Sequence, residues 1–369
     1  MAEKNPAYMR QLDGLRALCV AAVAWSHWGA YFGFDQKTIP GAEFGVETFF
    51  VISGFLITGI LLDNHSVALR PLVLKQFYIR RCLRIFPVFY VVFGVACLLD
   101  ADGARATWPW HAGYLSNIYF YIYGWCGALS HFWSLAVEEQ FYLFWPLFIF
   151  MVPPRYLFSA IGLVMLTAPV YALYMGVAHP SYGRVGVGVL MPSCLSALGM
   201  GALLARLVRQ KSRPPNFFQW LLVAGLTGMA AWFACDSPDW LKPFERLAED
   251  CVLGWLVFTV AGGIRRPVGW FLQCAPMSYL GRISYGIYII HNFAKPLVDG
   301  AQAALKYPKW LTWFYNSPWS CIPLFIAVTV GLASLSWFLY EKRLNDLKRF
   351  FPYPKANAAV AAPIASSPQ

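Results

Sequence analysis

The sequence predicts an all-α, polytopic membrane bundle of about ten transmembrane helices. Of its 369 residues, 59% are hydrophobic and 13% are charged, whereas soluble domains average about 45–50% and about 25%. The mean hydropathy of +0.50 agrees with a chain that is largely surrounded by lipid. The 16 Trp and 20 Tyr residues supply aromatic anchors for the lipid–water interface.

Apolar stretches of roughly spanning length follow one another along the whole chain. The third is short, and the ninth is the most polar. A further aromatic run, Tyr114–Trp125, is too short and too rich in Tyr to span, so we expect it at the interface. The ten predicted spans are residues 13–33, 44–62, 84–99, 133–152, 157–177, 188–207, 217–235, 247–264, 279–298 and 320–340.

The positions of Lys and Arg predict that the N- and C-termini are both cytoplasmic. With this orientation most of the 29 basic residues fall in cytoplasmic segments, as the positive-inside rule requires. Topology then accounts for the formal charge of +11, and we expect no nucleic-acid partner. We predict a multi-pass protein of the plasma (inner) membrane, with one integral membrane domain over residues 1–349 and a disordered, Ala/Pro-rich tail over 350–369. The 9 Cys lack any ligand-like spacing, so we expect no metal site and no disulfide framework.

Arg16 and His27 place a cation and an imidazole on one face of the first span. They are eleven positions apart, which at about 100° per residue returns to nearly the same helix face, roughly 16 Å along the axis. Ionisable groups at membrane depth are costly and usually face a polar cavity. Two plainer interpretations are an i,i+3 pair between Asp13 and Arg16 and a buried neutral His27 bonded to a neighbour.

Carboxylates enter the second and fourth spans. Glu138 and Glu139 lie side by side in the fourth span, and Glu47 lies near the start of the second. A carboxylate beside an imidazole fixes its tautomer and raises its basicity, as a general base requires. We therefore expect a carboxylate partner for His27, and the sequence leaves open which one.

Two further motifs suggest ligand contacts. The dipeptide Ser53-Gly54 can permit either close helix packing or the passage of a ligand against the backbone. Arg80, Arg81 and Arg84 precede a proline; they fit positive-inside topology, and they also suit the phosphates of an anionic ligand.

A stripe of polar residues runs along the ninth span. Gly281, Ser284, Tyr288 and His291 are spaced by three, four and three positions, so they share one helix face. Such a stripe faces protein or water rather than lipid. We expect His291 on the wall of a cavity, with structural hydrogen bonding and catalysis as equal alternatives.

Taken together, these residues resemble the membrane acyltransferase-3 family of O-acyltransferases. The resemblance runs in order over about residues 10–345. One departure is Glu47, where the family usually has Asp. The matching segments are Leu12–Arg16 with His27, Phe49–Ile57, Arg80 to Pro87, Trp133–Tyr142 and Gly281–His291.

The resemblance implies a transfer of an acyl group, with acetyl as the expected group, from cytoplasmic acyl-CoA to a hydroxyl of a saccharide or lipid-linked glycan. It assigns catalytic roles to His27, Arg16 and Glu138, and donor contacts to Arg80, Arg81, Arg84, Ser53 and Gly54. No metal is required. Direct transfer and an acyl-histidine intermediate both fit. The expected substrate pocket comprises Glu47, Trp133, Ser134, Tyr142, Tyr288 and His291.

A proton-coupled transporter of a small acidic or sugar-like solute is the alternative function. In that case His27 and Glu138 would form a proton relay. The sequence has no symmetric pair of broken helices, which mark the substrate site in many transporters, so the enzyme is the leading hypothesis.

Overall fold

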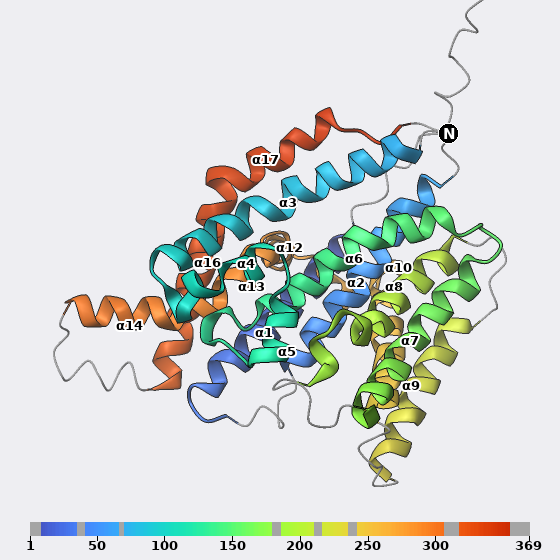
Figure 1. Ribbon diagram of the computed structural model, residues 1–369, viewed down its shortest axis with the longest axis horizontal. Coiled ribbons are helices and arrows are strands. Elements are labelled where there is room, and N and C mark those ends of the chain that lie inside the picture. Colours follow the sequence, from blue (N-terminus) through green and yellow to red (C-terminus); the bar gives the residue numbers. More distant parts are fainter. Residues whose placement is uncertain are drawn as a thin grey trace, which may run out of the picture.

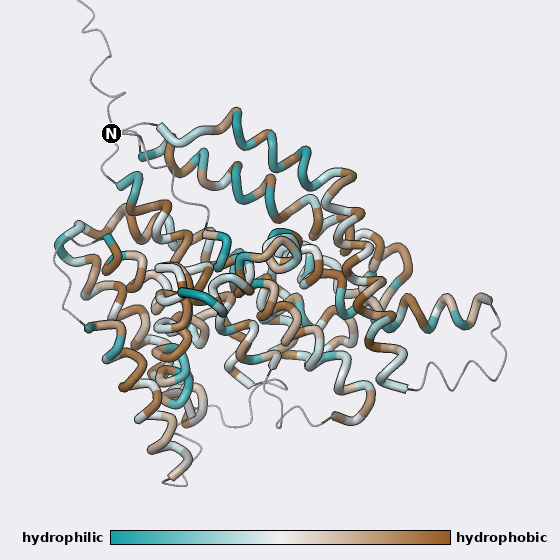
Figure 2. Tube along the Cα trace, turned by 180° about the vertical axis from the view of Figure 1, so that it is seen from behind, coloured by the Kyte–Doolittle hydropathy of each residue, from teal (hydrophilic) through white to brown (hydrophobic). Residues whose placement is uncertain are grey.

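A computed structural model describes residues 9–34, 41–65, 70–178, 186–209, 216–234, 242–305 and 317–354. Over these ranges the chain forms helices joined by short connections and contains no strand, which confirms the predicted all-helical class. Helices α3, α16 and α17 lie on one side of the bundle, and α7, α9 and α10 lie on the opposite side (Figure 1). Figure 2 shows hydrophobic residues along most of these helices.

The helices differ greatly in length, from 29 residues in α3 to single turns. The α-helices are α1 (Arg10–Ala30), α2 (Gly41–Asp63), α3 (Arg70–Leu98), α4 (Ala104–Ala112), α5 (Ser116–Tyr123), α6 (Phe132–Met151), α7 (Leu157–Ala178), α8 (Leu195–Val208), α9 (Phe217–Ala234), α10 (Lys242–Gly262), α11 (Val268–Gln273), α12 (Ala275–Arg282), α13 (Ser284–Ile290), α14 (Ala294–Leu305), α16 (Pro318–Ser336) and α17 (Lys342–Asp346). Short 3₁₀ or π segments are η1 (Ala101–Gly103), η2 (Gly127–Leu129), η3 (Val187–Val189), η4 (Met191–Cys194), η6 (His291–Phe293), η7 (Trp337–Glu341) and η8 (Leu347–Phe350).

Five helical stretches of the described chain are long and apolar enough to cross a membrane. By contrast α1, α6 and α10, of 21, 20 and 21 residues, are not among the five. These three helices carry Arg16, Glu138 and Arg246, so polar groups dilute their hydropathy. The count of ten spans therefore stays a prediction. The five stretches are Gly41–Asp63, Arg70–Leu98, Leu157–Met175, Met191–Val208 and Pro318–Phe350.

Two predicted spans differ from the structure. The third, predicted at 84–99, is part of α3, which begins at Arg70 and continues through Pro87. The three arginines of this region thus lie on a helix rather than in a loop. The ninth, predicted as one helix over 279–298, is broken into α12, α13, η6 and α14, with non-helical backbone angles at Ile283 between α12 and α13.

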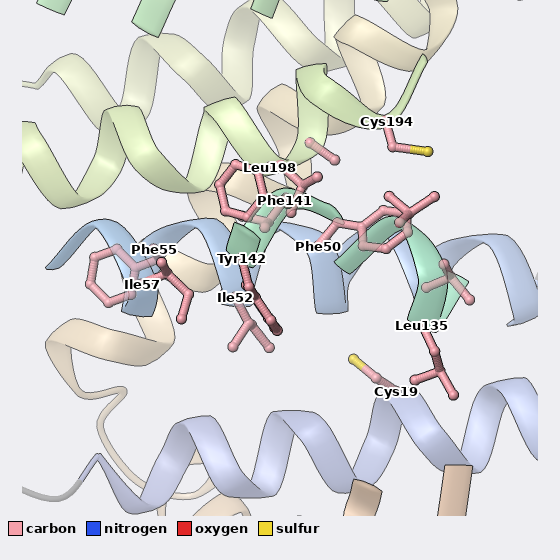
Figure 3. Packing of buried hydrophobic residues seen from close by; sticks show 14 of the residues in the cluster. Cys19, Phe50, Ile52, Phe55, Ile57, Leu135, Phe141, Tyr142, Cys194 and Leu198 are labelled. Carbon is pink, nitrogen blue, oxygen red and sulfur yellow. The ribbon is translucent and has the colours of Figure 1, made fainter. Parts of the chain in front are cut away.

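Helix α2 is the centre of the core and lies between α1 and α8 in Figure 3. A Cβ on Gly54 would come 1.9 Å from the carbonyl oxygen of Leu198, and a Cβ on Gly201 would come 2.0 Å from that of Val51. Only glycine allows two helices to approach so closely. Of the two interpretations of Ser53-Gly54, the glycine therefore serves helix packing.

Helix α1 packs against the short helices α11 and α12 by the same device. A Cβ on Gly281 would come 1.9 Å from the backbone oxygen of Asp13. Gly281 of the predicted polar stripe therefore faces α1 and lines neither cavity described below. The contact also fixes the start of α1, where Arg16 is found.

Both ends of the described chain lie at one edge of the bundle, next to the N label in Figure 1. The carbonyls of Lys348 and Phe351 accept hydrogen bonds from Arg80 on α3, and the Tyr353 ring lies against the same side chain. The first residues of the predicted tail thus contact the helical core. Residues 355–369 lie outside the described part.

Candidate active site

Two cavities meet inside the bundle at the side chains of Val46 and Tyr288. The smaller one, of about 80 Å³, is lined by three guanidinium groups, and we call it the arginine cavity. The larger one, of about 750 Å³, is lined by His27 and His131, and we call it the histidine cavity. Val46 and Tyr288 line both, so they form the partition between two chemically different spaces.

The arginine cavity places three guanidinium groups near several carboxylates, of which Glu138 lines the cavity itself. Arg16 forms an ion pair of 3.3 Å with Asp13, which is the plainer interpretation considered for this residue. Arg81 lies over the rings of Phe77 and Tyr142, at 5.6 and 5.4 Å from their centroids. Arg84 forms no hydrogen bond or ion pair with any described residue.

An unpaired guanidinium inside a protein is costly unless an anion can reach it. The five N–H donors of Arg match the paired oxygens of a phosphate. Arg81 and Arg84 therefore make this cavity suitable for a phosphorylated ligand.

A directed chain of hydrogen bonds ends at the carboxylate of Glu138. The Tyr142 hydroxyl donates to Ser53 Oγ over 3.0 Å, and Ser53 Oγ donates to Glu138 Oε1 over 2.6 Å. All three side chains line the arginine cavity. Glu138 is thus on the opposite side of the partition from His27.

His27 is joined to a second histidine. Its Nδ1 lies 2.7 Å from Nε2 of His291, and His291 Nδ1 lies 2.6 Å from the carbonyl oxygen of Tyr288. The indole N–H of Trp28 donates to the backbone oxygen of His291 over 3.0 Å. His27 and Trp28, consecutive residues of α1, thus both bind His291, which directly follows α13.

The expectation of a carboxylate beside His27 is wrong, because the structure gives it an imidazole instead. Glu47 does line the histidine cavity, but its Oε1 faces Arg246 Nε at 3.8 Å. The expectation that His291 lines a cavity also fails. His291 is fully buried behind His27 and is part of neither cavity wall.

Two hydroxyls mark the partition. The Tyr288 hydroxyl and Ser134 Oγ lie 2.5 Å apart. Ser134 lines the arginine cavity, and its neighbour on α6, Trp133, lines the histidine cavity. The start of α6 therefore contributes residues to both spaces.

Most of the sequence-predicted site residues gather around these two cavities. Three do not: Arg80 binds the backbone of residues 348–351, Gly54 packs on α8, and His291 is buried outside both linings. The arginine cavity holds Arg16, Ser53, Arg81, Arg84, Ser134, Glu138 and Tyr142, the histidine cavity holds His27, Glu47 and Trp133, and Tyr288 borders both.

Sequence reasoning missed several residues of the histidine cavity, among them Trp125, His131 and Arg246. His131 immediately precedes the Phe-Trp pair of the fourth span, and Arg246 immediately precedes the eighth. Both were overlooked because they lie outside the predicted span ends. The spacing of Arg246 and Asp250 by one helical turn was the available signal.

No group of three or more potential metal ligands occurs among the residues that the structure describes.

Comparison with known proteins identifies the class of this protein. The family model for the acyltransferase domain (Acyl_transf_3) matches residues 9–341, so the chain belongs to that family. No solved structure matches the chain.

Several curated relatives of this chain are named as O-acetyltransferases. The chain is 29% identical over 378 residues to peptidoglycan O-acetyltransferase OatA of Listeria monocytogenes, an alignment that covers 93% of this chain and 57% of the relative. It is 28% identical to the putative peptidoglycan O-acetyltransferase YrhL of Bacillus subtilis, over 92% of this chain and 55% of that protein. A putative O-acetyltransferase of Staphylococcus aureus, SAS0844, is 27% identical over 78% and 51% of the two chains. The chain spans about half the length of these relatives.

The position of Arg80 predicts a structural role for its guanidinium. We expect Arg80→Ala to raise hydrogen–deuterium exchange in residues 347–353, because the carbonyls of Lys348 and Phe351 lose their donor. Arg105→Ala is the matched control. Arg105 also donates to two backbone carbonyls, those of Cys97 and Leu98 at the C-terminal end of α3. It should affect exchange only near Cys97 and Leu98. Unchanged protection of residues 347–353 in Arg80→Ala would contradict this role.

Proposed function

We propose that this protein is an integral-membrane O-acetyltransferase that moves an acetyl group from acetyl-CoA to a hydroxyl of a saccharide-type acceptor. The observation that carries the proposal is the junction at Tyr288 of a cation-lined cavity with a cavity that contains His27. Membership of the acyltransferase family and the names of the relatives support the same reaction class.

The arginine cavity is proposed as the inner end of the donor site, since its volume of about 80 Å³ holds only a part of acetyl-CoA. Arg81 and Arg84 supply positive charge for the phosphates of CoA, and Ser53 lies on the wall along which the pantetheine arm would extend. The thioester would then reach the partition at Tyr288. Arg80, assigned to the same phosphates by the resemblance, is instead proposed to fasten the C-terminal segment beside this site.

The histidine cavity is proposed as the acceptor site. Its volume of about 750 Å³ lies within the 300–1,000 Å³ typical of ligand pockets. Trp125 and Trp133 offer flat apolar surfaces to a sugar ring, and Glu47 and Arg246 offer hydrogen-bond partners for its polar groups. A peptidoglycan-like or lipid-linked glycan fits this combination.

The reaction needs a base and little further activation, because a thioester is already reactive. His27 takes the proton of the acceptor hydroxyl while the hydroxyl oxygen bonds to the carbonyl carbon of the thioester. The carbon–sulfur bond then breaks, and the proton passes from His27 to the departing thiolate of CoA. Tyr288 and Ser134 lie at the partition, where their hydroxyls bond to each other and to the backbone oxygen of His131. One of these hydroxyls would turn its proton to the oxyanion that forms in between.

Glu138 and Arg16 act from the donor side in this proposal. Glu138 holds Ser53 and, through it, Tyr142 in one orientation, which shapes the wall of the donor cavity. Arg16 adds a charge to the same wall while its pair with Asp13 keeps it in place. Both residues would thus position the donor rather than exchange protons with the acceptor.

A bundle of ten spans with both termini in the cytoplasm would open the donor site to cytoplasmic acetyl-CoA and the acceptor site to the outer face of the plasma membrane. The location of both described chain ends at one edge supports an even number of spans. The arginine-rich part of α3 fits the cytoplasmic side.

Replacement of His27 tests the proposed reaction. We expect His27→Ala to lower acetyl transfer from radiolabelled acetyl-CoA to saccharide acceptors in detergent by about 10²- to 10⁴-fold, because the general base is lost. His65→Ala is the matched control. His65 lies just after α2, lines neither cavity, and its ring contacts the backbone oxygen of Ile149.

Full transfer activity of folded His27→Ala would refute the role of His27. The assay contains no membrane gradient, so transfer by the wild-type protein argues for an enzyme. No transfer in detergent, combined with solute uptake into vesicles that depends on a proton gradient, would replace the proposed function by transport.

The donor site is tested by comparing two donors. Arg84→Gln should raise KM for acetyl-CoA by about 10- to 100-fold, because a charged hydrogen bond contributes about 1.5–3 kcal/mol. KM for acetyl-pantetheine, which has no phosphates, should barely change. An equal increase for both donors would contradict phosphate binding by Arg84.

A further inference from the structure

His27, near the end of α1, and His291, in η6, form a chain of hydrogen bonds that ends at the carbonyl oxygen of Tyr288. This carbonyl determines which ring nitrogens carry protons. A backbone carbonyl oxygen only accepts hydrogen bonds. The Tyr288 oxygen lies 2.6 Å from His291 Nδ1, so this nitrogen carries a proton and donates it. In a neutral imidazole the other nitrogen, Nε2, is then an acceptor.

The acceptor at His291 Nε2 determines the tautomer of His27. Its partner at 2.7 Å is His27 Nδ1, which must therefore carry the proton of that hydrogen bond. The second ring nitrogen of His27, Nε2, is left with a free lone pair. Since His27 lines the histidine cavity, that lone pair is available to a ligand there.

The surroundings of His291 keep this arrangement rigid. The ring is fully buried, and the His27 and His291 planes are within 6° of parallel. The backbone of His291 is held by the indole N–H of Trp28. The neighbouring His131 donates from Nε2 to the Ile289 carbonyl, so it is occupied elsewhere and does not compete for His291.

We propose that His291 is a positioning residue that fixes His27 as the tautomer with its proton on Nδ1 and a free Nε2 facing the acceptor cavity. The inference rests on the proposed function of His27 as the base. It gives His291 the place that a carboxylate has in a serine-hydrolase triad, but as a neutral acceptor. A neutral partner orients the base without adding a negative charge to a buried, membrane-embedded site.

The neutral partner has a consequence for the reaction. When His27 takes the acceptor proton at Nε2, its Nδ1–H bond to His291 becomes charge-assisted and stronger. His291 cannot pass a proton further along, because the Tyr288 carbonyl accepts a hydrogen bond but no proton. The added proton therefore stays on the two rings and returns from His27 Nε2 to the leaving thiolate.

The direct test is the tautomer of His27, read by nitrogen-15 NMR of the full-length protein labelled at histidine. The six His signals are few enough to assign, and the His27→Gln variant identifies the His27 signal by its loss. We expect Nδ1–H and a pyridine-like Nε2 in the wild-type protein. In His291→Ala we expect a large share of His27 to carry its proton on Nε2 instead.

Two variants separate positioning from general packing. His291→Gln offers an acceptor oxygen and a donor N–H from one planar group, so it should restore the wild-type tautomer and most of kcat. His291→Ala should lower kcat by about 10- to 100-fold with little change in KM for acetyl-CoA. Trp28→Phe removes the hydrogen bond to the His291 backbone but leaves both imidazoles, and it should keep the wild-type tautomer.

A wild-type His27 with its proton on Nε2 would overturn the inference, whether or not the variants fold. An unchanged His27 tautomer in folded His291→Ala would overturn it as well. A protein with the expected tautomer but without any acetyl transfer would instead contradict the proposed function, because the NMR measurement does not depend on activity.

Discussion

The hydrogen bond between His27 and His291 is the interaction on which the arrangement of the site depends. It connects the end of α1 to the end of α13, residues 264 positions apart in sequence. Inside a membrane protein a polar side chain without a partner is costly, so each such group restricts how the helices can pack. The end of α13 lies at this contact, since the next residue, His291, bonds to His27 through its ring and to Trp28 through its backbone oxygen.

The partition at Tyr288 separates two kinds of chemistry. On one side, Arg81 and Arg84 provide guanidinium groups that can bind an anionic ligand. On the other side, His27 faces a larger cavity with tryptophans and charged groups. The proposed acyl transfer would use such a division, since a phosphorylated donor and a hydroxylated acceptor would meet at one bond while remaining in different environments. Helix α6 serves both sides through the adjacent residues Trp133 and Ser134.

The sequence identified the residues of the site better than it identified their partners. The helical class and the cavity positions of Arg16, His27 and Glu138 follow from the cost of charge in apolar stretches. The partner of His27 did not follow, because hydrogen bonds between distant segments depend on how helices rotate and break. Arg80 shows the same limit: it shares a motif with Arg81 and Arg84, yet its guanidinium reaches residues 348–351. Composition gives no signal for that contact.

The central claim is that donor and acceptor reach one bond from opposite sides of Tyr288. The most direct measurement is a cryo-electron microscopy structure of the protein with a non-hydrolysable acetyl-CoA analogue in which the thioester sulfur is replaced by methylene. We expect the phosphates beside Arg81 and Arg84 and the acetyl carbonyl at the partition, in contact with Nε2 of His27. Phosphates bound in the histidine cavity, or an acetyl group that stays out of contact with His27, would contradict the account.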